Sequence, residues 1–195
     1  GYAACAADAE PKGLRGRIRE RTDQKILRAV LDIIATKGVG GLTMEAVSRA
    51  SGVAKTTLYR RYANADDLMR HLATMIGPPI DFAATPLDRA HLRDLFERMQ
   101  STFDERYGLR AIGIVLSSGN PRVMEIAHQV VDPAERRFCD YLAEGAARGV
   151  CRADADGHFI FQTALGSMIA CKALEGDVAG WAAHMATMTA PLIFG

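Results

Sequence analysis

The sequence has few of the residues that build covalent or metal-bound frameworks. Among its 195 residues only four are cysteines, Cys5, Cys139, Cys151 and Cys171, and no two of them form a C-x-x-C pair. This wide spacing argues against zinc ligation and against a disulfide framework, so we interpret the four as incidental thiols, with redox sensing as an unsupported alternative. The five histidines show neither H-x-x-x-H nor H-E-x-x-H spacing, and we therefore expect no metal site and no cofactor.

Long apolar runs and catalytic motifs are also missing. No run of about 18 apolar residues occurs, and the alanine-rich start lacks a basic segment followed by an apolar core, so we expect a cytoplasmic protein without a membrane span. Neither the G-x-S-x-G elbow of hydrolases nor the G-x-x-x-x-G-K-[ST] phosphate loop is present. We therefore expect that the chain is not an enzyme; a catalytic pocket without a recognisable motif is the open alternative.

The composition is that of a globular protein with an uneven charge distribution. Hydrophobic residues make up 49% of the chain and charged residues 24%, and the length allows a sizeable core. Residues 1–80 hold 13 basic and 8 acidic residues, whereas residues 81–195 hold 11 basic and 15 acidic ones. A basic N-terminal part and an acidic C-terminal part are typical of a nucleic-acid-binding head on a body that stays off the nucleic acid.

Residues 42–68 predict two short helices joined by a tight turn. The first helix has an apolar face, formed by Met44, Val47 and Ala50. Thr43 precedes it, and its hydroxyl can accept a hydrogen bond from the first turn. Gly52 ends the helix because glycine adopts positive φ without steric cost.

The second helix of this pair, expected from Lys55 to Tyr62, has one apolar and one polar face. Leu58 and Tyr62 lie four residues apart and can pack on the first helix. The remaining side chains are hydroxyls, a phenol and cations, which suit phosphates and base edges better than a core: Lys55, Thr56, Thr57, Tyr59, Arg60 and Arg61. We predict a helix-turn-helix in which these residues bind the major groove of double-stranded DNA and Thr43 contacts a phosphate.

This stretch resembles the DNA-binding domain of the TetR family of bacterial transcriptional regulators. The family pattern G-V-x-x-x-x-L-Y-x-x-F/Y-x-x-K-x-x-L is matched at Gly52, Val53, Leu58, Tyr59, Tyr62 and Leu68. The chain departs from the pattern at Ala65, where the family usually has a lysine that contacts phosphate. The match covers roughly residues 23–72, and beyond it the resemblance is one of helical layout and length.

The resemblance and the helical periodicity together imply an all-α fold. We expect a flexible basic arm over residues 1–21, whose arginines are either solvated or reach phosphates or a minor groove. A three-helix, homeodomain-like helix-turn-helix domain follows over residues 22–68, and a helical ligand-binding and dimerisation domain over residues 69–195. One helix from Asn64 to Gly77 should bridge the two. Further helices are expected to start at Thr85–Pro86 and Pro121, with a kink or break near Asp132 as the favoured outcome for the latter.

The family resemblance also implies a small-molecule pocket and a homodimer. Candidate lining residues are Met75, Phe96, Met99, Phe103, Ile112, Leu116, Phe138, Tyr141 and Met168, each of which is equally suited to an ordinary core. The last two helices should dock on a second copy, and their candidate contact residues are Phe161, Ala164, Leu165, Met168, Trp181 and Met185. The alternative for these two helices is the core of a monomer.

The predicted function is that of a sequence-specific transcriptional regulator. We expect a repressor that a small apolar or amphipathic effector releases from a palindromic operator, because two recognition helices about 34–36 Å apart match successive turns of DNA. The alternative is a DNA-binding protein without ligand control, either constitutive or architectural. Neither the effector nor the operator follows from the sequence.

Overall fold

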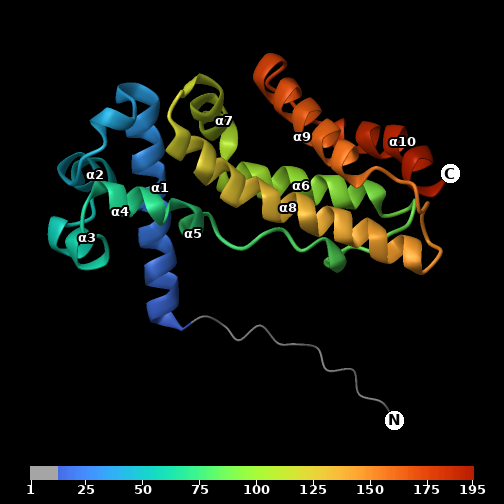
Figure 1. The fold of residues 1–195 in the computed structure, drawn as a ribbon, viewed down its shortest axis with the longest axis horizontal. Helices are drawn as coiled ribbons and strands as arrows, with labels where there is room; N and C mark the ends of the chain where they lie inside the picture. Colours follow the sequence, from blue (N-terminus) through green and yellow to red (C-terminus); the bar gives the residue numbers. More distant parts are fainter. Residues whose placement is uncertain (1–12) are drawn as a thin grey trace, which may run out of the picture. The chain divides into compact units, whose positions relative to one another are not determined.

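The computed structural model describes residues 13–195, in which every regular element is a helix (Figure 1). The all-α prediction is confirmed for this part of the chain. Within these residues one compact unit ends at Met69 and a second spans Arg70–Gly195, and the division falls one residue after the predicted end of the DNA-binding domain. Cys5 and the first part of the predicted arm lie outside the described residues.

The described part of the N-terminal unit contains three helices and most of a fourth around a small apolar core. Its elements are α1 (Leu14–Lys37), the 3-10 turn η1 (Val39–Gly41), α2 (Met44–Ser51), α3 (Lys55–Arg61) and most of α4 (Ala65–Arg70). Five side chains from four of these helices are fully buried and form the centre of this core: Ile26, Val30, Val47, Leu58 and Leu68. Because α2 and α3 together contribute only 15 residues, this shared core rather than helix propensity must hold them.

Helix α1 begins at Leu14, so the prediction of a flexible arm up to residue 21 is wrong for residues 14–21. The carbonyl of Gly13 accepts hydrogen bonds from the amides of Gly16 and Arg17, which opens the helix. The hydroxyl of Thr22 donates to the carbonyl of Ile18 at 2.9 Å, so Thr22 lies well inside the helix. The side chains of residues 13–21 are all exposed, and long unbranched arginines favour a helix without tertiary packing.

The helix predicted from Asn64 to Gly77 is two helices, α4 and α5 (Leu72–Ile76), separated at His71. Its predicted start is confirmed, because the side chain of Asn64 accepts a hydrogen bond from the amide of Asp67 at 2.9 Å. The carboxylate of Asp67 in turn accepts from the amide of Ala63, also at 2.9 Å. This reciprocal pair satisfies amides that the first turn of a helix leaves open.

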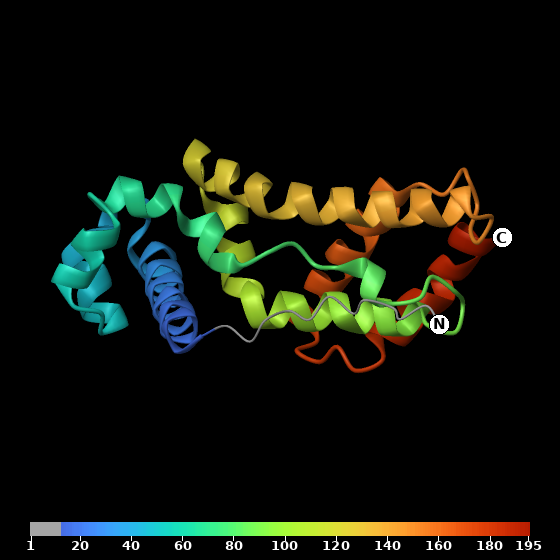
Figure 2. The same ribbon diagram turned by 90° about the horizontal axis from the view of Figure 1, so that it is seen from below.

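The C-terminal unit is built around two long helices, α6 (Leu92–Arg106) and α8 (Pro121–Ala147), which both run lengthwise along it (Figure 2). The other elements are α5, the 3-10 turn η2 (Phe82–Ala84), α7 (Gly108–Ser117), α9 (Gly157–Leu174) and α10 (Trp181–Phe194). Helix α10 packs closely along α6, and α9 packs on α8. Aromatic rings fill the space between them, with the ring centroids of Phe82 and Phe138 5.4 Å apart and those of Phe96 and Trp181 5.9 Å apart.

Two helix starts differ in how well local signals predicted them. Pro121 opens α8 as expected, with Asn120 as its cap. The helix continues through Pro133 to Ala147, so of the predicted kink or break near Asp132 the break is wrong. Thr85–Pro86 opens no helix, and α6 begins only at Leu92. Thr85 is instead extended, as the residue before a proline tends to be, and its buried carbonyl accepts the hydroxyl of Tyr141 at 2.5 Å. Burial raises the pKa of Tyr141 to about 12, so this hydroxyl stays protonated and donates.

A close approach in the C-terminal unit depends on glycine. A Cβ atom at Gly145 of α8 would lie 2.3 Å from a methyl carbon of Leu87 and 3.0 Å from the sulfur of Cys151. Any larger residue would therefore displace the buried side chain of Leu87.

Across residues 13–195, no helix combines the length and apolar character that a membrane crossing requires.

Candidate nucleic-acid interface

The turn between α2 and α3 is held by hydrogen bonds that the sequence pattern did not reveal. The hydroxyl of Ser48 donates to the carbonyl of Val53 at 2.7 Å, and the amide of Val53 donates to the hydroxyl of Ser51 at 3.1 Å. Gly52 has φ of 72°, the left-handed conformation predicted for it. The turn therefore closes on both sides of Gly52, which sets the position of the first residue of α3.

Local capping at the start of α2 agrees with the prediction. The hydroxyl of Thr43 accepts a hydrogen bond from the amide of Ala46 at 3.1 Å. Met44 and Val47 are buried as expected, but Ala50 is exposed. Three residues of an α-helix fall about 60° short of a full turn. The two steps from Met44 to Val47 and from Val47 to Ala50 therefore carry Ala50 away from the buried face.

Helix α3 presents most of the predicted DNA-binding side chains to solvent. Leu58 is fully buried and Tyr62 nearly so, which confirms the apolar face. Lys55, Thr56, Tyr59 and Arg60 are exposed on the other side, and Thr57 is half-buried. Tyr59 is the large aromatic of this helix left in solvent, 48% exposed, although burying its ring would stabilise the fold. A row of this chemistry suits phosphates and base edges, and its contact with DNA stays a prediction.

Arg61 differs from the other predicted DNA-binding residues. Its guanidinium bonds to the carboxylate of Asp23 on α1, and only 20% of its side chain is exposed. The guanidinium carbon also lies 5.4 Å from the centroid of the Tyr62 ring. The structure therefore removes Arg61 from the outward face on which the sequence had placed it, because a carboxylate 38 positions away in the chain captures it.

The predicted pocket residues are mostly core. Phe96, Met99, Phe103, Phe138, Tyr141 and Met168 belong to the buried cluster of the C-terminal unit, Ile112 packs on its edge, and Met75 is buried on α5. Leu116 is 80% exposed at the end of α7, so its assignment to a pocket is wrong. Its neighbour two positions back, Ile114, is the buried residue of this turn, which places Leu116 on the opposite side of the helix.

Most of the predicted dimer contacts lie on the inward faces of their helices. Five of them are buried inside the single chain: Phe161, Ala164, Met168, Trp181 and Met185. Leu165 is partly buried against the same core. Helices α9 and α10 carry large apolar residues on both their inner and their outer sides, so the sequence pattern did not show which side packs on α6 and α8.

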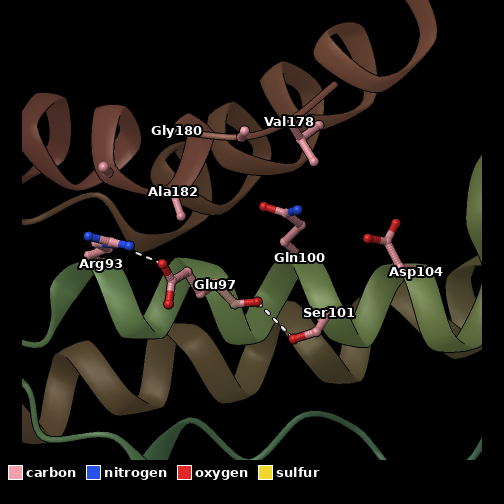
Figure 3. A pocket seen from close by; sticks show the side chains of 10 residues that line it. Arg93, Glu97, Gln100, Ser101, Asp104, Val178, Gly180 and Ala182 are labelled. Carbon is pink, nitrogen blue, oxygen red and sulfur yellow. Dashed lines mark hydrogen bonds and ion pairs between the residues drawn. The ribbon is translucent and has the colours of Figure 1, made fainter. Parts of the chain in front are cut away.

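A hollow of about 410 Å³ lies between α6 and the start of α10, and none of the predicted pocket residues lines it (Figure 3). Glu97, Gln100 and Asp104 project from α6 toward the small residues of the facing turn. Its carboxylates are already engaged, because Arg93 lies 2.7 Å from Glu97 and Lys172 pairs with Asp104. The hollow thus has charged and polar side chains on its α6 side and small apolar residues on the facing side, and it contains none of the large apolar or aromatic side chains that usually line an effector site.

The cysteines and histidines of the described chain do not form a reactive cluster. Cys139, Cys151 and Cys171 are free thiols, and burial raises the pKa of both Cys139 and Cys151. Within residues 13–195, no three metal-ligating side chains gather at one place. His91 instead pairs with Asp88 at 2.7 Å, as a neighbour on the same turn.

Comparison with known proteins agrees with this architecture. Residues 26–72 match the family model described as "Bacterial regulatory proteins, tetR family". The whole fold is similar to a putative TetR-family transcriptional regulator from Mesorhizobium loti, with a TM-score of 0.65 and 14% identity over 90% of this chain and 98% of that one. Residues 26–72 therefore form a DNA-binding domain of the TetR family.

Two further solved structures share this TetR fold. The fatty acid degradation regulator FadR from Bacillus halodurans has a TM-score of 0.61 and 16% identity, over 86% of this chain and 93% of that one. FadR from Bacillus subtilis, solved in complex with stearoyl-CoA, has a TM-score of 0.59 and 14% identity, over 85% and 96% of the two chains. At these identities the likeness concerns the fold. None of the curated proteins compared with the chain matches it.

The hydrogen bond of Ser48 in the turn between α2 and α3 leads to a testable prediction. Replacing Ser48 by alanine leaves the half-buried Val53 carbonyl without its hydroxyl donor, and we expect the free energy of unfolding to fall by about 1 kcal/mol. The measurement is urea denaturation followed by circular dichroism. Ser117→Ala is the control, because that hydroxyl bonds only to the carbonyl of Gly113 in its own helix; equal losses in both variants would contradict the role of the Ser48 bond.

Proposed function

We propose that this TetR-family chain is a repressor that binds a palindromic operator as a homodimer and is released from it by an amphipathic ligand. The observation that carries the proposal is the solvent-exposed face of α3, with Lys55, Thr56, Tyr59 and Arg60 on a helix whose opposite face is buried. Such a helix fits the major groove, where arginine binds guanine O6 and N7 and hydroxyls bind phosphates.

Phosphate contacts must come from residues other than the usual lysine, because Ala65 occupies its position at the start of α4. The arginines in the first turns of α1 offer substitutes, since residues 13–21 are all exposed. These residues are helical, and a helix about 10–12 Å wide does not enter a minor groove about 6 Å wide. We therefore propose that this part of α1 contacts phosphates and reads no base.

Selection of bound sequences from a random DNA pool tests DNA recognition. The native chain is expected to recover an inverted repeat, and a Tyr59→Ala, Arg60→Ala double variant is expected to recover none, because it removes the exposed aromatic and cationic groups of α3. Arg136→Ala, an exposed arginine of α8, is the charge control and should recover the native motif. A weak, sequence-independent affinity with a steep salt dependence in the native chain would instead support an architectural DNA-binding protein.

Dimerisation is proposed through the outer faces of α9 and α10. Four large apolar residues on these helices are more than half exposed: Phe159 at 63%, Leu174 at 85%, Met188 at 59% and Leu192 at 53%. Helix α10 carries no Asp, Glu, Lys or Arg, which a surface facing water would normally contain. The last two helices thus remain the proposed dimer interface, but the proposed contact residues differ from those predicted from the sequence.

Replacing Met188 and Leu192 by glutamate tests this interface. We expect the native chain to be a dimer and the Met188→Glu, Leu192→Glu variant to be a monomer in light scattering, because two buried charges per copy would face each other across the interface. Leu116→Glu is the control, since Leu116 is equally apolar and 80% exposed on α7, and it should leave the mass unchanged. A native chain that stays monomeric at all concentrations contradicts the proposed homodimer.

The effector is proposed to place an apolar chain in the core of the C-terminal unit. The FadR of Bacillus subtilis was solved with stearoyl-CoA, an amphipathic molecule of this kind. Two methionines, Met99 and Met168, lie among the buried rings of this chain's core, and methionine side chains adapt readily to a new neighbour. We propose entry beside α7, a ten-residue helix in which Ile114 is the fully buried side chain.

Thermal unfolding and operator binding test the effector class. A long-chain acyl-CoA is expected to raise the unfolding midpoint and to weaken operator binding, whereas CoA without an acyl chain should do neither. A ligand that binds the released state about 100-fold more tightly than the DNA-bound state shifts the equilibrium between the two by about 2.7 kcal/mol. If neither this ligand nor a broader amphipathic screen alters operator affinity, the constitutive DNA-binding protein is the better interpretation.

A further inference from the structure

The contact between Arg61 and Asp23 joins the end of α3 to α1. Arg61 is the last residue of α3, and Asp23 lies 38 positions earlier in the chain. Their side chains are only 20% and 22% exposed, in contrast to the 57% and 50% of the Lys55–Glu45 pair at the start of the same helix. The inner pair is therefore partly shielded from solvent, where an ion pair is stronger than one on the surface.

Helix α3 has few other means of fixing its C-terminal end. It is seven residues long, its start has no side-chain cap, and Leu58 is its one fully buried residue. Its close packing is with α2, and its backbone approaches α1 only sparsely. The Ser48 and Ser51 hydrogen bonds hold its first turn, so the last turn is left to Tyr62 and to the Arg61–Asp23 pair.

Tyr62 completes this contact. It is 5% exposed, and the Arg61 guanidinium carbon lies 5.4 Å from the centre of its ring. Burial raises the pKa of Tyr62, and Arg61, Asp23 and Arg19 are all close enough to act on it electrostatically. Arg61 is thus held by a carboxylate on one side and by an aromatic ring on another, which leaves its guanidinium a restricted range of positions.

We infer that Arg61 and Asp23 form a positioning pair that sets the orientation of the recognition helix, and that Arg61 itself contacts neither base nor phosphate. This inference rests on the proposed function, because it concerns how the exposed face of α3 is presented to DNA. Tyr59 and Arg60 are the adjacent residues whose direction the pair controls. A small rotation of a seven-residue helix would move both away from the base edges.

The inference predicts an effect of Asp23 that is opposite in sign to simple electrostatics. Removing an acidic residue close to a DNA-binding surface should strengthen binding to any DNA, because phosphate repulsion decreases. A positioning role predicts the reverse for the operator alone. We expect Asp23→Asn to weaken operator binding about tenfold, within the range for directly interacting residues, while binding to random duplex DNA is unchanged or stronger.

Glu45→Gln is the matched control. Glu45 is also an acid in the N-terminal unit, and it lies 3.9 Å from Lys55 with both side chains largely exposed. Its removal frees Lys55 without loosening α3, so operator and random DNA should both bind as well as before or better. The operator is the motif that the native chain selects; if the native chain selects none, the proposed function and this inference fail together, before any variant is compared.

Two further variants separate positioning from direct contact. Arg61→Ala is expected to weaken operator binding as Asp23→Asn does, to leave the slope of affinity against salt unchanged, and to add no further loss in the double variant. The exchanged pair, Asp23→Arg with Arg61→Asp, should bind the operator better than either of its single substitutions. Circular dichroism checks that each variant keeps its helices. If a single substitution unfolds the N-terminal unit, operator binding by the exchanged pair is the measurement that tests the inference.

The opposite results would overturn the inference. If Arg61 binds a phosphate, Arg61→Ala lowers the salt slope by about 0.9, and Asp23→Asn strengthens operator binding because it releases the arginine. The exchanged pair would then be the weakest variant, since it places a carboxylate against the DNA.

Discussion

Burial of Leu58 in the core of the N-terminal unit is the interaction on which this unit depends. Helix α3 has seven residues, too few to be stable alone in water, and the free energy that orders it must come from its inner face. Full burial of a leucine contributes roughly 1.5–3 kcal/mol. Because Leu58 is buried in the core, the side chains on the opposite side of α3 face solvent.

The C-terminal unit is stabilised differently, by long helices that pack around a core rich in aromatic side chains. Phe96, Phe138 and Trp181 bring α6, α8 and α10 together, and each is buried. Helices α9 and α10 carry large apolar residues on their outer sides as well as their inner ones, which the surface of a monomer does not require. Their inner faces complete this core, and their outer faces leave Phe159, Leu174, Met188 and Leu192 in solvent as material for an interface.

The sequence was most informative where a structural signal is local. Thr43 and Asn64 each cap the helix that follows them, as expected, because a cap depends on residues within one turn. It was least informative where two faces of one helix have the same chemistry. Phe161 and Trp181 were expected at an interface and lie in the core, since no periodicity distinguishes an inner from an outer face in an apolar helix.

By itself, then, the sequence determined an all-helical chain, the helix-turn-helix with its exposed cationic face, and the TetR resemblance, because spacing and turn chemistry act over a few residues. Tertiary structure alone decided which side of α9 and α10 faces outward and where Arg61 points. Arg61 is exposed in any isolated helix and is turned inward only by Asp23, 38 positions away. Such contacts depend on how helices pack, which short-range patterns do not encode.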